Sequence, residues 1–198
     1  MRSFLEINGF FVFFIIFLFW GCNNSNQDII KKEKSFEQTN DIKEPLLGKI
    51  NNWEISLNDF KKRLVRIDSY GKIEGFDIND FQARKDMLSQ LVTVEILYQI
   101  GIEKGVDKLE DVISLTGKTK RTAIIDEVMV SLEKEVSIDE IVAFYENNKD
   151  LIGMPLLEAK ENIRNVLCGE KLNNEIAKVI LDFKKRNNVE INDYLLKD

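Results

Sequence analysis

The sequence predicts a mostly α-helical domain with a small two- or three-stranded sheet that joins its N- and C-terminal ends. Three observations lead to this fold class. Several segments repeat apolar residues at steps of three and four, the period of an amphipathic helix. Helix-starting and helix-ending residues bracket these segments. Short alternating segments at 49–57 and 189–191 have the two-residue period of strands.

Residues 81–107 combine a long helical pattern with more apolar surface than any other segment, and they predict the central helix of the domain. Its buried stripe is predicted to consist of Met87, Leu91, Val94, Tyr98 and Ile102, widened by Leu88. Between 94 and 102 apolar residues spread around the helix, so we expect neighbours on several sides. Asp80 suits the N-terminal cap and Gly105 the end of the helix.

The segments on either side of the central helix complete the first half of the domain. Residues 49–57 predict a short strand or a hairpin, with Asn51-Asn52 at the turn. Ser56 is expected to cap a helix with Leu57, Phe60, Leu64 and Ile67 on its buried face. After Gly105, a short helix opening near Asp107 is expected to stop at Gly117.

Three further helices and a strand are predicted in the second half. The first covers 118–135 and buries Ile124, Ile125, Val128 and Leu132. Ser137 and Glu140 form a capping box for the next, a short helix whose apolar side is Ile138, Ile141, Val142 and Tyr145. Pro155 suits the start of a long helix that runs to about Arg186. The strand at 189–191 is expected to pair with the strand near Ile50.

Composition excludes several classes of function. The chain has 198 residues, a formal net charge of −6 and no histidine. Nucleic acid is therefore an unexpected partner, because affinity for phosphate backbones comes from excess Lys and Arg. Without histidine, Ser-His-Asp, Cys-His and His-ligated zinc sites are excluded. We expect no enzymatic activity, no metal and no cofactor.

The amino-terminal segment resembles a bacterial lipoprotein signal peptide. Residues 9–20 form an apolar run, shorter than the roughly 17 to 25 residues of a membrane-spanning helix, and Gly21-Cys22 follows it. The resemblance predicts that residues 1–21 are removed and that Cys22 carries acyl chains, palmitate among them. A hydrophobic leader that is uncleaved or ordinarily cleaved is the alternative.

Residues 22–45 are polar and predict a disordered tether, and 46–198 form the domain. The protein is then expected in the cell envelope. It is anchored by lipid to the outer face of the inner membrane or to the outer membrane, on the periplasmic or extracytoplasmic side.

Four segments, in order, resemble the chaperone module of the SurA and PrsA family of extracytoplasmic folding factors. KINNWEISLNDFKKRL is similar to its opening strand, turn and capped helix, and MLSQLVTVEILYQIGIEKGVD to its central helix. VSIDEIVAFYENNKD is similar to the helix that leads into the isomerase domain. MPLLEAKENIRNVLCGEKLNNEIAKVILDFKKRNNVEI is similar to the closing helix and strand. The resemblance covers about residues 47–196.

The chain departs from that family at one place. Isomerase-bearing members carry a parvulin domain between the last two of these segments, whereas here four residues separate Asp150 from Pro155. A prolyl isomerase domain is therefore expected to be absent.

The resemblance implies a membrane-tethered protein that binds unfolded envelope or secreted polypeptides through an apolar groove. Candidate peptide-binding residues are Phe81, Tyr98, Phe144 and Tyr145, each of which has ordinary core or rim packing as its alternative. A different class of function stays open at this point. In that alternative the protein is a scaffold or assembly lipoprotein that binds one folded partner.

Overall fold

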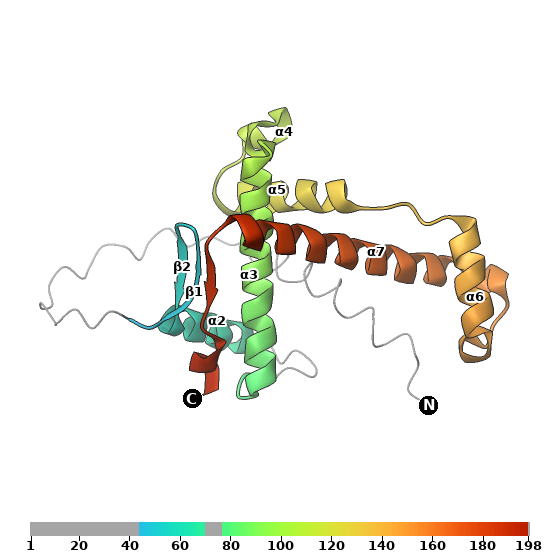
Figure 1. Cartoon of the computed structure of the whole chain (residues 1–198), viewed down its shortest axis with the longest axis horizontal. Helices are drawn as coiled ribbons and strands as arrows, with labels where there is room; N and C mark the ends of the chain where they lie inside the picture. Colours follow the sequence, from blue (N-terminus) through green and yellow to red (C-terminus); the bar gives the residue numbers. More distant parts are fainter. Residues whose placement is uncertain (1–43, 70–76, 198) are drawn as a thin grey trace, which may run out of the picture. The chain divides into compact units, whose positions relative to one another are not determined.

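The computed structural model of this chain describes residues 44–69 and 77–197, which are mostly helical with a three-stranded antiparallel sheet (Figure 1). It contains two compact units. The sheet unit comprises the described residues up to Val92 and those from Asn188 onward, and the helical unit is Thr93–Asn187. The predicted leader, Cys22 and the tether as far as Lys43 lie outside the described residues. None of the described helices is long and apolar enough to cross a membrane.

The sheet confirms both the predicted hairpin and the predicted pairing of the C-terminal strand. β1 (Leu46–Ile50), β2 (Trp53–Ser56) and β3 (Val189–Ile191) lie in the order β2-β1-β3 (Figure 1). Ile50 is opposite Trp53 in β2 and opposite Val189 in β3. Asn51 in the turn has a φ of 50°, a left-handed conformation that asparagine tolerates better than most residues.

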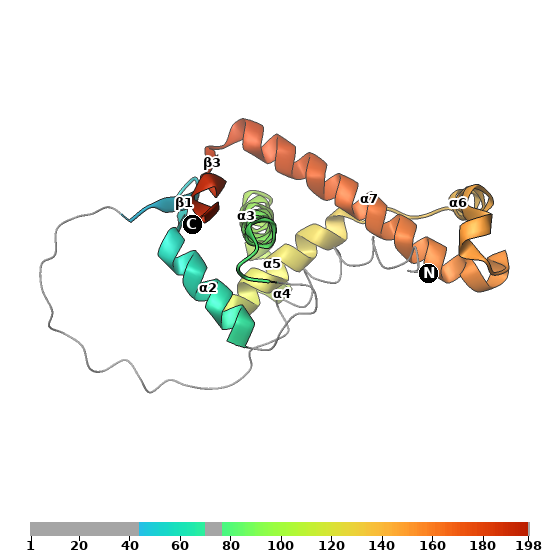
Figure 2. The same cartoon turned by 90° about the horizontal axis from the view of Figure 1, so that it is seen from below.

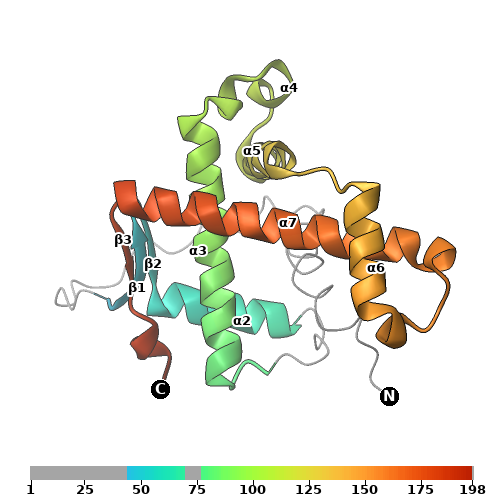
Figure 3. The ribbon, with the colours of Figure 1, turned by 45° about the vertical axis from the view of Figure 1, so that its right-hand side comes forward.

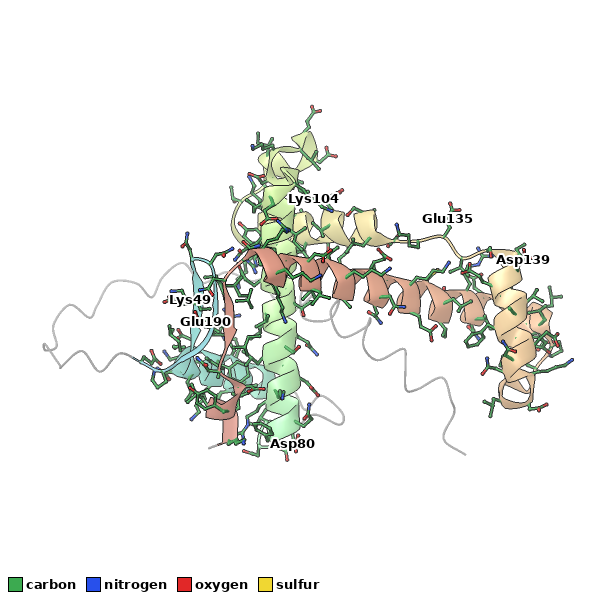
Figure 4. The ribbon with its side chains drawn as sticks, in the orientation of Figure 1. Lys49, Asp80, Lys104, Glu135, Asp139 and Glu190 are labelled. Carbon is green, nitrogen blue, oxygen red and sulfur yellow. The ribbon has the colours of Figure 1, made fainter. Side chains whose placement is uncertain are left out.

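Hydrogen bonds and charges hold β3 against β1. Asn192 donates its backbone N–H to Leu47 O and its side-chain Nδ2 to Leu46 O, both at 2.9 Å. Lys49 and Glu190 are opposite each other on the two strands (Figure 4). Lys49 also binds Glu54, and this hydrogen bond and charge, with the charge of Glu190, raise the pKa of the lysine.

Helix α2 (Leu57–Ser69) follows the hairpin and contacts β1 and β2 (Figure 2). The predicted cap is confirmed, since Asp59 N–H donates to Ser56 Oγ at 3.1 Å. Phe60 and Leu64 are buried as predicted. The sheet unit ends in the 3-10 helix η3 (Asp193–Lys197), whose Asp193 pairs with Lys85 at 2.9 Å.

Helix α3 (Phe81–Glu103) begins and ends where the sequence predicts, but its buried face differs. Asp80 Oδ1 accepts the Ala83 N–H at 2.7 Å, and Gly105 follows in the left-handed conformation; Figure 4 labels Asp80 and Lys104 at the two ends. The buried apolar residues are Met87, Leu88, Val92, Ile96, Leu97 and Ile100. The predicted stripe is therefore wrong in part, because Leu91 and Val94 are half-buried and Ile102 is 40% exposed.

The helical unit continues with η2 (Val106–Lys108), α4 (Glu110–Ile113) and α5 (Gly117–Leu132). All four residues predicted on the inner face of α5 are buried. Gly117 does not end the preceding helix as predicted. It is the first residue of α5, and α4 already ends at Ile113.

The last two helices are α6 (Ile138–Ile152) and α7 (Leu156–Arg186), joined by a short turn, and we call this pair the α6–α7 hairpin. Figure 3 shows α6 lying across the first part of α7, with which it makes contact. The Ser137–Glu140 capping box is present, and α7 ends at Arg186 as predicted. The small core between them consists of Ile141, Tyr145, Ala159 and Ile163.

Candidate functional site

Glu95 is the one charged side chain that is buried in the part of the chain that the structure describes, with 3% of its surface exposed. Arg121 of α5 pairs with its Oε2 at 2.7 Å, and Gln99 Nε2 donates to its Oε1 at 2.8 Å. The Arg121 guanidinium also lies 4.2 Å from the centroid of the Tyr98 ring. The candidate binding residue Tyr98 is thus half-buried and engaged by a neighbouring helix.

This cluster of α3 and α5 has a structural explanation. Both carboxylate oxygens of Glu95 accept hydrogen bonds, as a buried charge requires. Next to it the two helices approach closely at Gly101, where an added Cβ would lie 2.3 Å from Ile124 Cγ2. We therefore assign the cluster to the packing of α3 on α5.

Phe144 and Tyr145 belong to the core between α6 and α7. Tyr145 is 7% exposed, and its hydroxyl donates to Met154 O at 3.0 Å. Phe144 is half-buried and packs against the same core. Tyr145 therefore holds the turn between the two helices in addition to filling the core.

The four candidate residues do not form one site within either unit. Phe81, half-buried, is the first residue of α3 and belongs to the sheet unit. In the helical unit, Tyr98 lies in the α3–α5 packing, whereas Phe144 and Tyr145 lie in the α6–α7 core. These four residues thus share their aromatic type, but they have separate packing roles.

Exposed apolar side chains that the sequence patterns did not identify lie on α6, on α7 and in the turn between them. We call this set of residues the hairpin surface, and it consists of Ile138, Val142, Leu151, Met154 and Leu157. Leu157 is 87% exposed and Leu151 64%. Ile138 and Val142 are one helical turn apart on α6, so they share a face. Their predicted place on the buried side of α6 is wrong, since only Ile141 and Tyr145 of that set are buried.

The start of α6 is fixed to α7 by a charged contact. Lys171 Nζ lies 2.7 Å from Glu140 Oε1 and donates to Glu135 O at 2.7 Å. Glu140 also accepts the N–H of Ser137 at 2.8 Å. The hydrogen bond from Lys171 and that from the Ser137 backbone lower the pKa of Glu140 to about 2. Figure 4 labels Glu135 and Asp139 on either side of this contact. The contact holds the start of α6, and with it part of the hairpin surface, against α7.

The sheet unit contains a separate hollow of about 230 Å³. Its apolar lining consists of Leu57, Phe60, Leu64, Val65, Ile78 and Leu196. Lys61 and Arg84 also line it, and Arg84 Nε is buried without a hydrogen-bond partner. We call it the α2 hollow, and the sequence analysis did not identify it, because its residues come from three separate segments.

The described residues contain no group of three or more His, Cys, Asp or Glu side chains that would hold a metal ion. Comparison of the chain with models of protein families, with curated proteins and with solved structures found no match.

Proposed function

We propose that this protein is a lipid-anchored extracytoplasmic chaperone-like protein that holds unfolded envelope or secreted polypeptides without prolyl isomerase activity. The observation that carries the proposal is the hairpin surface. Five large apolar side chains are exposed on a pair of helices that are themselves held by a packed core. Where exposed apolar side chains form a contiguous patch, the patch marks a place where other chains bind.

The chemistry of the hairpin surface suits clients of varied sequence. Its residues are aliphatic or methionine, which adapt to many partners, and Met154 supplies the flexible thioether. Binding comes from apolar burial, so it is weak, degenerate and independent of nucleotide. Client segments that are buried in the folded state lose access to the surface once they fold.

The order of sequence segments that resembles the SurA and PrsA module supports the same proposal. At the position where the resemblance would put an isomerase domain, this chain has a tight turn. Gly153 takes a left-handed φ of 64°, and the Tyr145 hydroxyl binds Met154 O across the turn. With acyl chains on Cys22 and the tether of 22–45, the domain would reach clients near the membrane.

The proposal is tested by the aggregation of an unfolded client. We expect the purified full chain, in several-fold molar excess, to slow light scattering by a chemically unfolded envelope protein diluted from urea. The double variant Leu151→Ser with Leu157→Ser should lose most of this effect, because it removes the two most exposed side chains of the hairpin surface. Exposed substitutions change stability by only about 0.5 kcal/mol, so folding should be preserved.

The matched control is the double variant Val130→Ser with Leu181→Ser. These side chains are exposed to a comparable degree in the same unit but lie outside the hairpin surface. The control should suppress aggregation as well as the unmodified chain does. Equal loss in both double variants, or no suppression by the unmodified chain, would contradict the proposal. Capture of a single stoichiometric folded partner, with no competition by unfolded peptides, would favour the scaffold alternative instead.

A further inference from the structure

We infer that the α2 hollow of the sheet unit is a second binding site, and that its ligand is a polypeptide segment carrying an apolar side chain next to a carboxylate. The inference does not depend on the hairpin surface, since all residues of the hollow belong to the sheet unit. It assigns to the sheet unit a ligand narrower than the unfolded clients of the proposed function.

The size of the hollow selects the apolar part of the ligand. Its volume of about 230 Å³ is below the roughly 300 to 1,000 Å³ of sites that enclose a whole small molecule. It has room for one large side chain, whose backbone then lies over the rim. The base is formed by buried Phe60, Leu64 and Leu196, which are apolar and fixed by the core. A Leu, Met or Phe side chain therefore fits better than a polar one.

The charges at the hollow select the second part of the ligand. Arg84 and Lys61 both line it, in a chain whose formal net charge is −6. None of the ion pairs within the described residues uses either side chain. Arg84 Nε is buried and has no hydrogen-bond partner, an arrangement that folded proteins generally avoid.

A ligand carboxylate at the hollow would neutralise the positive charges of Lys61 and Arg84. Arginine binds carboxylates through paired N–H donors, and Lys61 adds a second positive charge. One apolar side chain in the hollow and a carboxylate on the next residue satisfy both features together. A long acyl chain satisfies the charge but exceeds the volume, which favours a peptide over a lipid.

The test measures binding of labelled heptapeptides to the full chain in phosphatidylcholine nanodiscs, with empty nanodiscs as the blank. The three peptides are built of glycine and serine. At the centre one carries leucine followed by glutamate, one leucine followed by glutamine, and one serine followed by glutamate. We expect the first to bind about tenfold more tightly than either other peptide. The reason is that each of the others lacks either the charged group or the apolar side chain.

Two variants locate the binding. Arg84→Gln should bring the affinities for the glutamate and glutamine peptides together, whereas Arg63→Gln, on an exposed residue of α2 outside the hollow, should leave their ratio unchanged. Val65→Glu places a competing carboxylate at the rim and should weaken the leucine-glutamate peptide about tenfold. Val65 is 63% exposed, so this variant should fold.

Several results would overturn the inference. One is an unchanged glutamate-to-glutamine ratio in Arg84→Gln, and another is equal binding of all three peptides. Octanoate that displaces the peptide and binds as tightly would show an amphiphile site instead. Concentration-dependent self-association that Arg84→Gln abolishes would show that a second copy fills the hollow. The client aggregation assay tests the hairpin surface, and the peptide-binding assay tests the α2 hollow. Either proposal can therefore fail without the other.

Discussion

Replacing Arg121 by methionine tests the physical account of the helical unit. Methionine keeps the aliphatic part of the side chain and removes the charged donor. The substitution leaves the Glu95 carboxylate, 3% exposed, with the Gln99 amide as its remaining described hydrogen-bond donor. It also removes the cation from the Tyr98 ring.

The expected loss follows from these contacts. A hydrogen bond to a charged group contributes about 1.5 to 3 kcal/mol, and a cation on an exposed ring about 0.5 to 1 kcal/mol. The Arg121 side chain is 34% exposed, so part of the electrostatic gain is screened by water. We expect Arg121→Met to lower the free energy of unfolding by about 2 to 4 kcal/mol. For a chain of this length that corresponds to a Tm lower by roughly 5 to 12 °C.

Urea denaturation followed by far-ultraviolet circular dichroism measures this loss. Lys118→Met, on an exposed residue of the same helix, is the matched control and should change stability by less than about 0.5 kcal/mol. The double variant Glu95→Leu with Arg121→Met should recover much of the loss, because it removes the unpaired buried charge. A single variant as stable as the control, or a double variant no better than the single one, would refute this reasoning.

Three further predictions concern other parts of the chain. Glu140→Gln should lower the Tm at neutral pH, and the difference should shrink as the pH falls from about 4.5 towards 2, because the stability contributed by the depressed pKa of Glu140 is complete above this range and is lost through it. A difference that is constant with pH would show that its contact with Lys171 contributes nothing. Gly101→Ala should destabilise the chain by about 1 to 3 kcal/mol despite the better helix propensity of alanine, since its Cβ meets Ile124; the loss should be non-additive with Ile124→Ala. Cys22→Ser should move the protein from the detergent phase to the aqueous phase in a partitioning experiment, and retention in the detergent phase would reject lipidation.

Local chemistry accounts for what could be predicted about the fold. Ser56, Asp80 and Ser137 cap helices because their side-chain oxygens accept free N–H groups of the first turn, whatever lies elsewhere. Gly105 ends α3 because a left-handed residue costs glycine little. Signals of this kind act within a few residues, so the sequence alone shows them.

The residues of the hairpin surface and of the α2 hollow could not be predicted in the same way. Ile138 and Ile141 are both isoleucines near the start of α6, yet only Ile141 is buried. Which of them faces α7 depends on the crossing of two helices, and apolar spacing does not report it. The α2 hollow depends similarly on Leu57, Ile78 and Leu196, which come from distant segments.

The sequence by itself therefore determined the helical class and most element boundaries, because caps, turns and periodicity are local. Only the tertiary structure decided that Glu95 is buried, that Tyr145 holds a turn and that the hairpin surface is left uncovered. The physical reason is that burial depends on which neighbour covers a side chain. A glutamate becomes a core residue only where another helix brings an arginine to it.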